Sequence, residues 1–194
     1  MAPARPDPCR TCKATRMDAH RQLAEPSSWV CRHTPLVRAG GRVLDVACGS
    51  GRHARYLAGR GFEVEAVDRD AAALHGLAGV AGVNTRIADL EGAAWPYAGE
   101  RFDAVVVTNY LHRPLFVHLA AALAPCGVLI YETFALGNER YGRPRNPDFL
   151  LLPGELLQFA HGRLEVTAYE NLDVTVPRPA AIQRMCAIKC AGAA

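Results

Sequence analysis

The residues with the clearest chemical potential stand where a short apolar run gives way to glycines. Residues 42–47 form this run, which contains Asp45, and Gly49 and Gly51 follow at once. Glycines let a backbone turn tightly and let a ligand approach without a Cβ in the way. A helix beginning near Arg52 would aim its N-terminal amides at that ligand. The pattern predicts a loop that binds a nucleoside or nucleotide.

Two cofactor classes use such a loop, and the charge around it separates them. The stretch from Gly49 to Ala54 matches the G-x-G-x-x-G/A pattern of nicotinamide dinucleotides, which place a pyrophosphate at a helix N-terminus. Asp45 lies four residues before Gly49, and a carboxylate there repels a pyrophosphate. S-adenosylmethionine carries an ammonium and a sulfonium instead, which a carboxylate attracts. The charge therefore favours S-adenosylmethionine as cofactor, with a turn cap as the structural alternative for Asp45.

Two further acids follow the next two apolar runs. Asp68 ends the run 62–67 and can accept hydrogen bonds from both ribose hydroxyls, which either cofactor class possesses. Asp89 ends the run 83–88, where a carboxylate can bind an adenine amino group while Leu90 packs on the ring. A turn cap is the alternative for Asp89. Because the carboxyl ends of parallel strands meet at one sheet edge, the three acids together favour a nucleoside ligand.

The wider sequence predicts the elements that would position these residues. Apolar runs alternate with segments of helical spacing, which is typical of βαβ units and a parallel sheet. We expect strands at residues 42–47, 62–67, 83–88, 102–108, 127–134, 164–169 and 181–187. We expect helices at 52–59, 71–78, 115–124 and 153–160, with two short helices within 17–39. The last two strands are joined by 170–179, too short for a helical crossover, which predicts an antiparallel hairpin.

Four motifs recur in an order and spacing typical of one family. They read VLDVACGSGRHARYLA, VDRD after the second run, ADL after the third, and FDAVVV. Together they resemble class I S-adenosylmethionine-dependent methyltransferases over roughly residues 28–190. Three later segments are similar to small bacterial methyltransferases of the tellurite-resistance type. These read TNYLHRPLF, LIYETFALGNERYGRPRNPDFLLLPGEL and PRPAAIQRMCA.

The resemblance implies the fold, the cofactor and its contacts. The implied fold is α/β, a doubly wound Rossmann-like seven-stranded sheet, mostly parallel with an antiparallel last strand and helices on both faces. S-adenosylmethionine would be the cofactor and S-adenosylhomocysteine the product. Ala47 departs from the family, which has a glycine there, and we expect its methyl group to be tolerated. The cofactor-binding candidates are Asp45, Ala47, Cys48, Gly49, Ser50, Gly51, Asp68, Arg69, Asp89, Leu90 and Asn109.

The segment after the fourth strand is expected to face the methyl acceptor. Methyl transfer is an in-line displacement that mainly needs orientation, so a base is required only when the nucleophile carries a proton. Residues 108–114 lack the N-P-P-Y or D-P-P-Y signature of amino-directed nucleic-acid methyltransferases. Tyr110 and His112 are the catalytic candidates, and His112 suits a general base because its pKa lies near neutrality. Helix capping is an equal alternative for His112, and Arg113 either binds an anion or solvates the helix start.

The connection 136–150 is longer than most, and long loops at a ligand edge are usually functional or disordered. We expect it to fold down as a lid over the acceptor, with Arg143 or Arg145 binding an anionic group. A solvated loop is the alternative. Glu132, at the end of the fifth strand, is a candidate for holding an acceptor cation, with packing or capping as its alternative.

The seven cysteines indicate reduced thiols and a cytoplasmic protein, because a chain of this length needs no disulfide staples. Cys9, Cys12, Cys186 and Cys190 could supply four zinc thiolates. The two pairs are more than 170 residues apart, far from the usual spacing, and no metal site is predicted.

Length and composition bound the remaining choices. With 194 residues and a net charge of +3, we expect a flexible polar leader at 1–16 and one methyltransferase domain at 17–194. No apolar run reaches the ~20 residues that a bilayer needs, so no membrane partner is expected. The acceptor is expected to be a small molecule such as a thiol, chalcogen anion or carboxylate. The alternatives are an RNA or protein acceptor, for which residues 1–60 offer 11 basic against four acidic side chains, and a non-catalytic module that binds S-adenosylmethionine.

Overall fold

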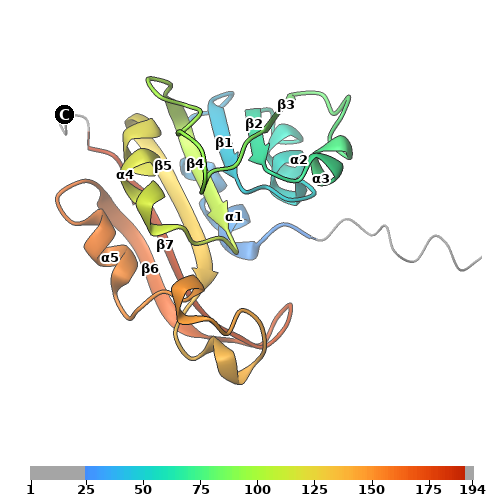
Figure 1. Cartoon of the computed structure of the whole chain (residues 1–194). Coiled ribbons are helices and arrows are strands. Elements are labelled where there is room, and N and C mark those ends of the chain that lie inside the picture. The colour runs from blue at the N-terminus through green and yellow to red at the C-terminus, as the bar shows by residue number, and fades with distance from the viewer. Residues whose placement is uncertain (1–24, 191–194) are drawn as a thin grey trace, which may run out of the picture.

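A computed structural model describes residues 25–190 and shows a seven-stranded sheet in the order β3-β2-β1-β4-β5-β7-β6 (Figure 1). The strands are β1 (Arg42–Val46), β2 (Glu63–Asp68), β3 (Val83–Ile87), β4 (Phe102–Thr108), β5 (Leu123–Phe134), β6 (Glu165–Val174) and β7 (Ala180–Ile188). Strands β1 to β5 pair in parallel, and β7 is antiparallel to both of its neighbours. The predicted fold class and the predicted β6–β7 hairpin are confirmed.

Helices cover both faces of this sheet. They are α1 (Ser28–His33), α2 (Arg52–Ala58), α3 (Ala71–His75), α4 (Phe116–Ala122) and α5 (Glu155–Ala160). Helices α4 and α5 pack on one face and α1 to α3 on the other. Along β4, Val105 and Val107 point into the first core while Ala104 and Val106 point into the second. Burial on both faces explains why residues 104–107 of β4 form an unbroken apolar run.

The predicted elements are all present, and their ends differ where turn residues intervene. Helix α3 stops at His75 rather than at 78, because Gly76 caps it and turns follow. Helix α4 stops at Ala122, and the extended backbone of Leu123 already pairs with Phe102, so β5 begins before 127. Strand β6 runs on to Val174, which shortens the hairpin link to 175–179.

The N-terminal part also differs in detail from the sequence-based expectation. Of the two short helices expected within 17–39, the structure shows α1 and a 3-10 turn at Thr34–Leu36. Residues 17–24, the leader at 1–16, Cys9 and Cys12 lie outside the described residues. Within 25–190, no helix is long and apolar enough to span a bilayer, and no three His, Cys, Asp or Glu side chains group to hold a metal ion.

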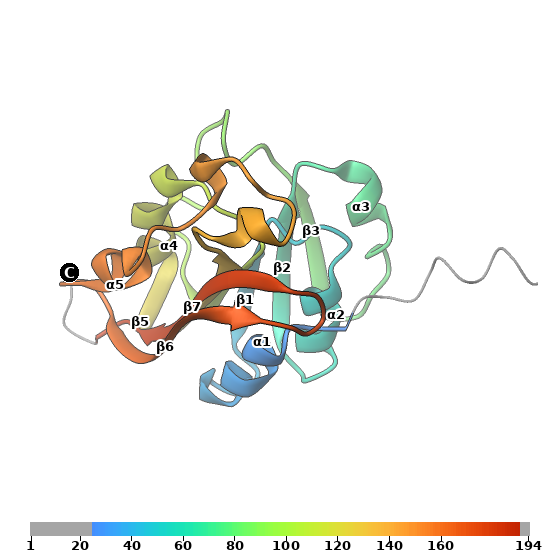
Figure 2. The ribbon, with the colours of Figure 1, turned by 90° about the horizontal axis from the view of Figure 1, so that it is seen from below.

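The carboxyl ends of the parallel strands meet at one edge, the lower one in Figure 1, which Figure 2 shows from below. Between β1 and β4 the strand order changes direction, and open α/β sheets bind ligands at such switch points. The loop 136–150 also lies at this edge, as both views show. The fold therefore gathers the predicted loops around the β1–β4 boundary.

Candidate cofactor and acceptor sites

The loop after β1 contains three residues with a left-handed backbone. Gly49 has φ +54°, and the space where its Cβ would stand is empty to 4 Å, which leaves open backbone for a ligand. Gly51 has φ +76°, and a Cβ there would come within 2.4 Å of the Leu77 side chain. Ala47 has φ +51°, a conformation that costs a residue with a Cβ roughly 1–2 kcal/mol. Such strain concentrates at functional sites, and here it stands where the family has glycine.

Asp45 is the buried acid of this loop. Its side chain is 1% exposed, and neither carboxyl oxygen has a hydrogen-bond partner among the described residues. Burial raises the pKa of Asp45 to about 7; the Ala54 amide, which falls short of hydrogen-bond geometry, and the Arg52 guanidinium oppose the rise. A buried charge without a partner is costly, so a bound cation would relieve this site. The orphaned carboxyl fits the ammonium of S-adenosylmethionine and does not fit a pyrophosphate.

Asp68 fastens the loop after β1 to the end of β2. One carboxyl oxygen accepts from the Gly49 amide at 2.8 Å, and the other accepts from the Asp70 amide at 2.9 Å. Asp68 is half-buried, and each carboxylate oxygen has a second lone pair for a ligand hydroxyl. The geometry suits a ribose lying against a rigid loop.

Around Asp68 the structure forms a first hollow of about 180 Å³. It is lined by Ala47, Asp68, Arg69, Ala88, Asp89, Leu90, Glu91 and Tyr110. Five of the cofactor candidates thus come together from the ends of β1, β2 and β3. Asp89 also accepts from the Glu91 amide at 3.0 Å, and this and the Gly92 amide lower its pKa. The turn cap weighed for Asp89 is therefore present, and it holds the carboxylate at the hollow.

The remaining candidates of the glycine loop contribute less through their side chains. Cys48 is buried in the core on the α1–α3 face, where burial raises the pKa of its thiol. Its side chain packs, so only its backbone faces the loop surface. Ser50 is exposed beside the hollow and does not line it.

A second hollow of about 480 Å³ lies on the β4 side of the β1–β4 boundary. Its volume is typical of small-molecule sites. Asn109, a cofactor candidate with φ +55°, and Glu132 line it at the ends of β4 and β5. The rest of its wall comes from residues 25–28, from α2 and from the β6–β7 hairpin. Its apolar side chains are Pro26, Phe134, Val174, Val176, Pro177, Ala180 and Ile182, and its charged ones are Glu25, Arg52, Glu132, Arg178 and Arg184.

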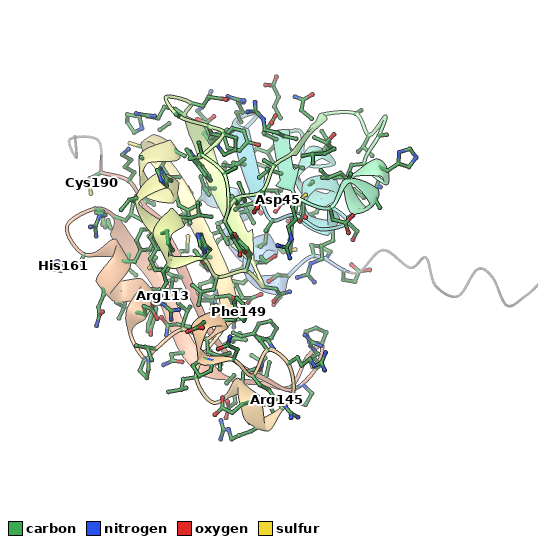
Figure 3. All side chains as sticks on the ribbon, in the orientation of Figure 1. Asp45, Arg113, Arg145, Phe149, His161 and Cys190 are labelled. Atoms are coloured by element: carbon green, nitrogen blue, oxygen red, sulfur yellow. The ribbon has the colours of Figure 1, made fainter. Side chains whose placement is uncertain are left out.

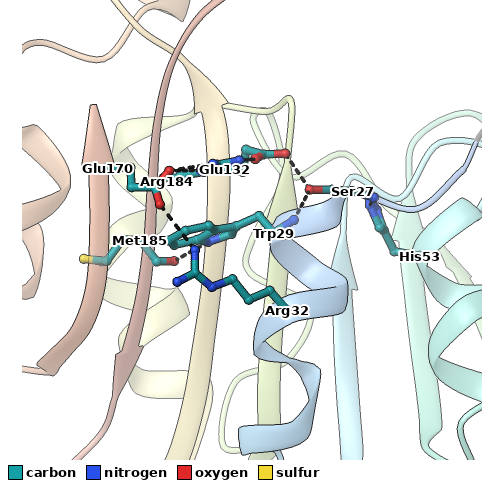
Figure 4. A network of polar contacts seen from close by, with 8 residues as sticks. All are labelled: Ser27, Trp29, Arg32, His53, Glu132, Glu170, Arg184 and Met185. Carbon is teal, nitrogen blue, oxygen red and sulfur yellow. Dashed lines mark hydrogen bonds and ion pairs between the residues drawn. The ribbon is translucent and has the colours of Figure 1, made fainter. Parts of the chain in front are cut away.

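Two hydrogen bonds fix Ser27 in the wall of the second hollow (Figure 4). The Ser27 hydroxyl donates to Glu132 Oε1 at 2.7 Å, and the Ser27 amide donates to His53 Nε2 at 3.0 Å. Because Nε2 accepts, the neutral ring carries its proton on Nδ1, which lies 3.2 Å from Thr108 Oγ1. Burial lowers the pKa of His53 to about 3, so the ring stays neutral. The segment 25–28 is therefore a fixed wall.

Arg184 completes this network on the other side of Glu132. Its guanidinium bonds to Glu132 Oε2 at 3.1 Å and to Glu170, and it lies 4.6 Å from the centre of the Trp29 ring. The Trp29 indole donates to the Met185 carbonyl at 3.3 Å. Both oxygens of Glu132 are thus occupied within the protein. The arrangement favours the structural alternative for Glu132 over the holding of an acceptor cation.

The structure moves the two catalytic candidates away from the second hollow. The left-handed turn at Asn109 directs the chain toward the α4 face, where Tyr110 packs against the core and lines the first hollow. His112 is half-buried with Asp89 among its charged neighbours, and it makes no side-chain cap at the 3-10 turn that follows. Neither residue lines the second hollow. Tyr110 therefore lies at the first hollow and His112 beside it, and their catalytic role stays a prediction.

The loop 136–150 is fastened in place at several points. Arg113 donates to the carbonyls of Asp148 and Leu150 and pairs with Glu155, so it is a structural anchor. The Asn138 amide donates to the Pro144 carbonyl and its oxygen accepts from the Ala181 amide. The predicted lid is therefore a loop tied to β7 and to the start of the α4 segment.

The two loop arginines have different places. Arg143 lines a small third hollow of about 30 Å³ that shares Phe134 and Arg178 with the second hollow. Arg145 is exposed at the far end of the loop and lines none of the three hollows (Figure 3). Arg143 therefore lies in a hollow that adjoins the second one, whereas Arg145 does not.

Sequence reasoning missed Ser27, His53, Arg178 and Arg184 as residues of this edge. The hydrogen bonds that join Ser27 to His53 and to Glu132, and Arg184 to Glu132, span 26, 105 and 52 residues, and no local pattern connects these residues. The one available signal was the PRPAAIQRMCA segment, which contains both Arg178 and Arg184.

Comparison with known proteins gives the family context. Residues 43–127 match the model of a methyltransferase domain. No curated protein sequence matches the chain significantly. Among solved structures, TehB from Haemophilus influenzae is similar with 19% identity and a TM-score of 0.67, covering 83% of this chain and 61% of that one. The chain therefore spans less than two thirds of that TehB chain.

Two further structures share the fold. A TehB-like S-adenosylmethionine-dependent methyltransferase from Corynebacterium glutamicum has 18% identity and a TM-score of 0.62, covering 83% of this chain and 86% of that one. An S-adenosylmethionine-dependent methyltransferase from Mesorhizobium loti has 18% identity and a TM-score of 0.63, covering 82% and 96%. Residues 43–127 thus match a methyltransferase domain, and the chain shares its overall fold with S-adenosylmethionine-dependent methyltransferases.

Proposed function

We propose that a single domain at 17–194 transfers a methyl group from S-adenosylmethionine to a small acceptor held in the second hollow. The main support for this proposal is that the two hollows lie at the ends of the adjacent strands β1 and β4. Ala47, after β1, lines the first hollow, and Asn109, after β4, lines the second. When bound, S-adenosylmethionine supplies a sulfonium methyl to which an acceptor lone pair bonds, while the carbon–sulfur pair returns to sulfur and S-adenosylhomocysteine leaves.

Each cofactor contact follows from the chemistry of one chain group. Asp68 accepts from the ribose hydroxyls, Asp89 accepts from the adenine amino group, and Leu90 packs on the ring. Asp45 meets the ammonium, directly or through a water molecule. The open backbone at Gly49 lets the ligand approach the loop. Arg69 closes the rim of the first hollow.

In the second hollow the chain orients the acceptor and excludes water from it, and it supplies no general base. Glu132 has both oxygens engaged, and Tyr110 and His112 lie elsewhere. Orientation alone can supply roughly 7–11 kcal/mol of a barrier. An acceptor whose nucleophile is already deprotonated at neutral pH, such as a thiolate or carboxylate, needs nothing more.

The test is calorimetry of the whole chain with S-adenosylmethionine, S-adenosylhomocysteine and NADH, beside Asp68→Ala. Micromolar binding of the first two ligands, lost in the variant, supports the proposal and opens an acceptor screen. Binding of NADH alone would replace it with a reductase. Tight binding of S-adenosylmethionine with no transfer to any acceptor would favour a non-catalytic module. Affinity for RNA that falls steeply with salt would favour a nucleic-acid acceptor.

A further inference from the structure

We infer that the second hollow accepts an organic molecule with an apolar body and one anionic group, which is bound by Arg178 together with Arg143 of the adjoining third hollow. This inference rests on the proposed function only in naming that molecule the methyl acceptor. The binding itself can be tested without any transfer.

The walls of the second hollow indicate the apolar body. Phe134 and Ile182 form part of its inner wall, and Val176, 79% exposed, stands in the hairpin link with Pro177. Burying apolar area contributes roughly 25 cal/mol per Å², a gain that a bare inorganic oxyanion cannot obtain here. A hollow of about 480 Å³ also leaves such a small ion without contacts on most sides.

The charges of the second hollow leave one cation over. Arg184 is compensated by Glu132 and Glu170. Arg52 makes no ion pair within 25–190, but it donates to the Glu25 backbone carbonyl at 3.4 Å, and the opposite charge of the Glu25 side chain in the same hollow offsets its own. Arg178 makes no ion pair with any residue of 25–190. Its guanidinium lies 5.7 Å from the centre of the Phe134 ring, so it borders the apolar wall.

The adjoining third hollow adds a second free guanidinium. Arg143 and Arg178 both line it, and no acidic residue does. Arg143 likewise forms no ion pair within the described part of the chain. Two like charges brought to one small hollow repel, and an anion between them removes that repulsion. A guanidinium also binds a planar carboxylate through two parallel hydrogen bonds, which favours an organic acid.

The loop anchors explain why these arginines hold their places. Asn138, 1% exposed, binds the Pro144 carbonyl and the Ala181 amide and so fixes the loop against β7. Arg140 pairs with Asp173 on β6 at 3.1 Å. The same loop therefore contains one paired arginine, Arg140, and one free arginine at the rim, Arg143.

The experiment uses two probes with the same apolar body. These are 8-anilinonaphthalene-1-sulfonate, which is anionic, and N-phenyl-1-naphthylamine, which is uncharged. Both are titrated by fluorescence into the whole chain saturated with S-adenosylhomocysteine. We expect the sulfonate to bind at least tenfold more tightly than the uncharged probe. Hydrogen bonds to charged groups are worth roughly 1.5–3 kcal/mol, so Arg178→Gln should weaken sulfonate binding about tenfold and leave the uncharged probe unchanged.

Three variants make the result specific. Arg143→Gln should act in the same direction as Arg178→Gln, and Arg178→Lys should recover most of the affinity because it restores the charge. Arg145→Gln is the matched control, since it removes one exposed arginine of the same loop without touching a hollow. Equal losses in Arg145→Gln and Arg178→Gln, or equal affinities of the two probes, would overturn the inference.

The same samples separate this inference from the proposed function. Failure of the wild-type chain to bind S-adenosylhomocysteine would overturn the proposed function. The probe titrations, repeated without S-adenosylhomocysteine, would still decide the anionic site. Unchanged melting temperatures in the exposed Arg178 and Arg143 variants show that affinity and not folding has changed.

Discussion

The first and second hollows, on either side of the β1–β4 boundary, are built in opposite ways. The first is assembled mostly from residues at or just after the carboxyl ends of strands, such as Ala47, Asp68 and Asp89. The second is assembled from residues far apart in the chain, such as Ser27 and Arg184. The first therefore depends on local loop geometry, whereas the second depends on which distant segments the fold brings together.

The two hollows also differ in whether the buried carboxyl groups beside them already have hydrogen-bond partners. Asp45, in the loop that borders the first hollow, has two buried oxygens without partners among the described residues, so a bound cation would stabilise this region. Glu132 has both oxygens bonded to the protein, so the wall of the second hollow is complete before any ligand binds. The first hollow therefore borders polar groups that only a ligand would satisfy, whereas the polar groups around the second are satisfied by the protein itself. Four variants test this contrast.

The largest effect is expected on the stability of the fold, through the ion-pair network in the wall of the second hollow. Arg184→Ala leaves Glu132 and Glu170 facing each other at a mostly buried site, and breaking a buried pair costs roughly 3 kcal/mol or more. At about 2–4 °C per kcal/mol for a chain of this size, the melting temperature should fall by about 6–12 °C. Arg140→Ala removes an exposed pair with Asp173 and should change stability by less than about 1 kcal/mol. Equal effects in calorimetric melting would mean that this wall is not preformed.

The next effect concerns ligand binding in the first hollow alone. Asp68→Ala removes the carboxylate that holds the Gly49 amide and faces the first hollow. Loss of charged hydrogen bonds worth roughly 1.5–3 kcal/mol each should weaken S-adenosylhomocysteine binding about a hundredfold in calorimetry. Binding of 8-anilinonaphthalene-1-sulfonate should be unchanged. Parallel loss of both ligands would show that the two hollows are one coupled site.

The third effect is a pH dependence caused by Asp45. Its pKa of about 7 in the folded chain exceeds the unfolded value, so the folded state binds the proton more tightly. Wild-type stability should therefore fall as pH rises from about 4 to about 7, with Arg52 and Asp68 as the charged neighbours. Asp45→Asn removes this dependence. Relative to wild type, it should gain roughly 2 kcal/mol between pH 5 and pH 8 in urea unfolding.

A flat difference between Asp45→Asn and wild type across that range would show that the carboxyl already has a partner. The same variant should bind S-adenosylmethionine more weakly at pH 8, because the amide offers no charge to its ammonium. Greater stability combined with weaker binding is the expected signature of a site that its ligand completes.

The smallest effect tests the strain at Ala47. Ala47→Gly removes the cost of a left-handed alanine, about 1–2 kcal/mol, from the folded state. The added freedom of glycine in the unfolded chain lowers the free energy of unfolding by roughly 0.5–1 kcal/mol. The net gain should be about 0.5 kcal/mol in urea unfolding. Ala72→Gly, at an exposed position of α3, is the matched control and should lose roughly 0.5–1 kcal/mol. A loss at both positions would show that the loop stores no strain at Ala47.

The sequence was enough to predict the sheet, the order of its elements and the residues that meet at the first hollow. This was possible because a buried parallel strand must be an apolar run and because ligand-edge residues stand at its carboxyl end or in the loop that follows, as Asp68 and Gly49 do. The make-up of the second hollow could be seen only in the tertiary structure. The turn at Asn109 directs Tyr110 to the α4 face, and Glu132 meets Ser27 across 105 residues of chain and Arg184 across 52. Such contacts depend on packing between distant segments, for which a local pattern of residues carries no signal.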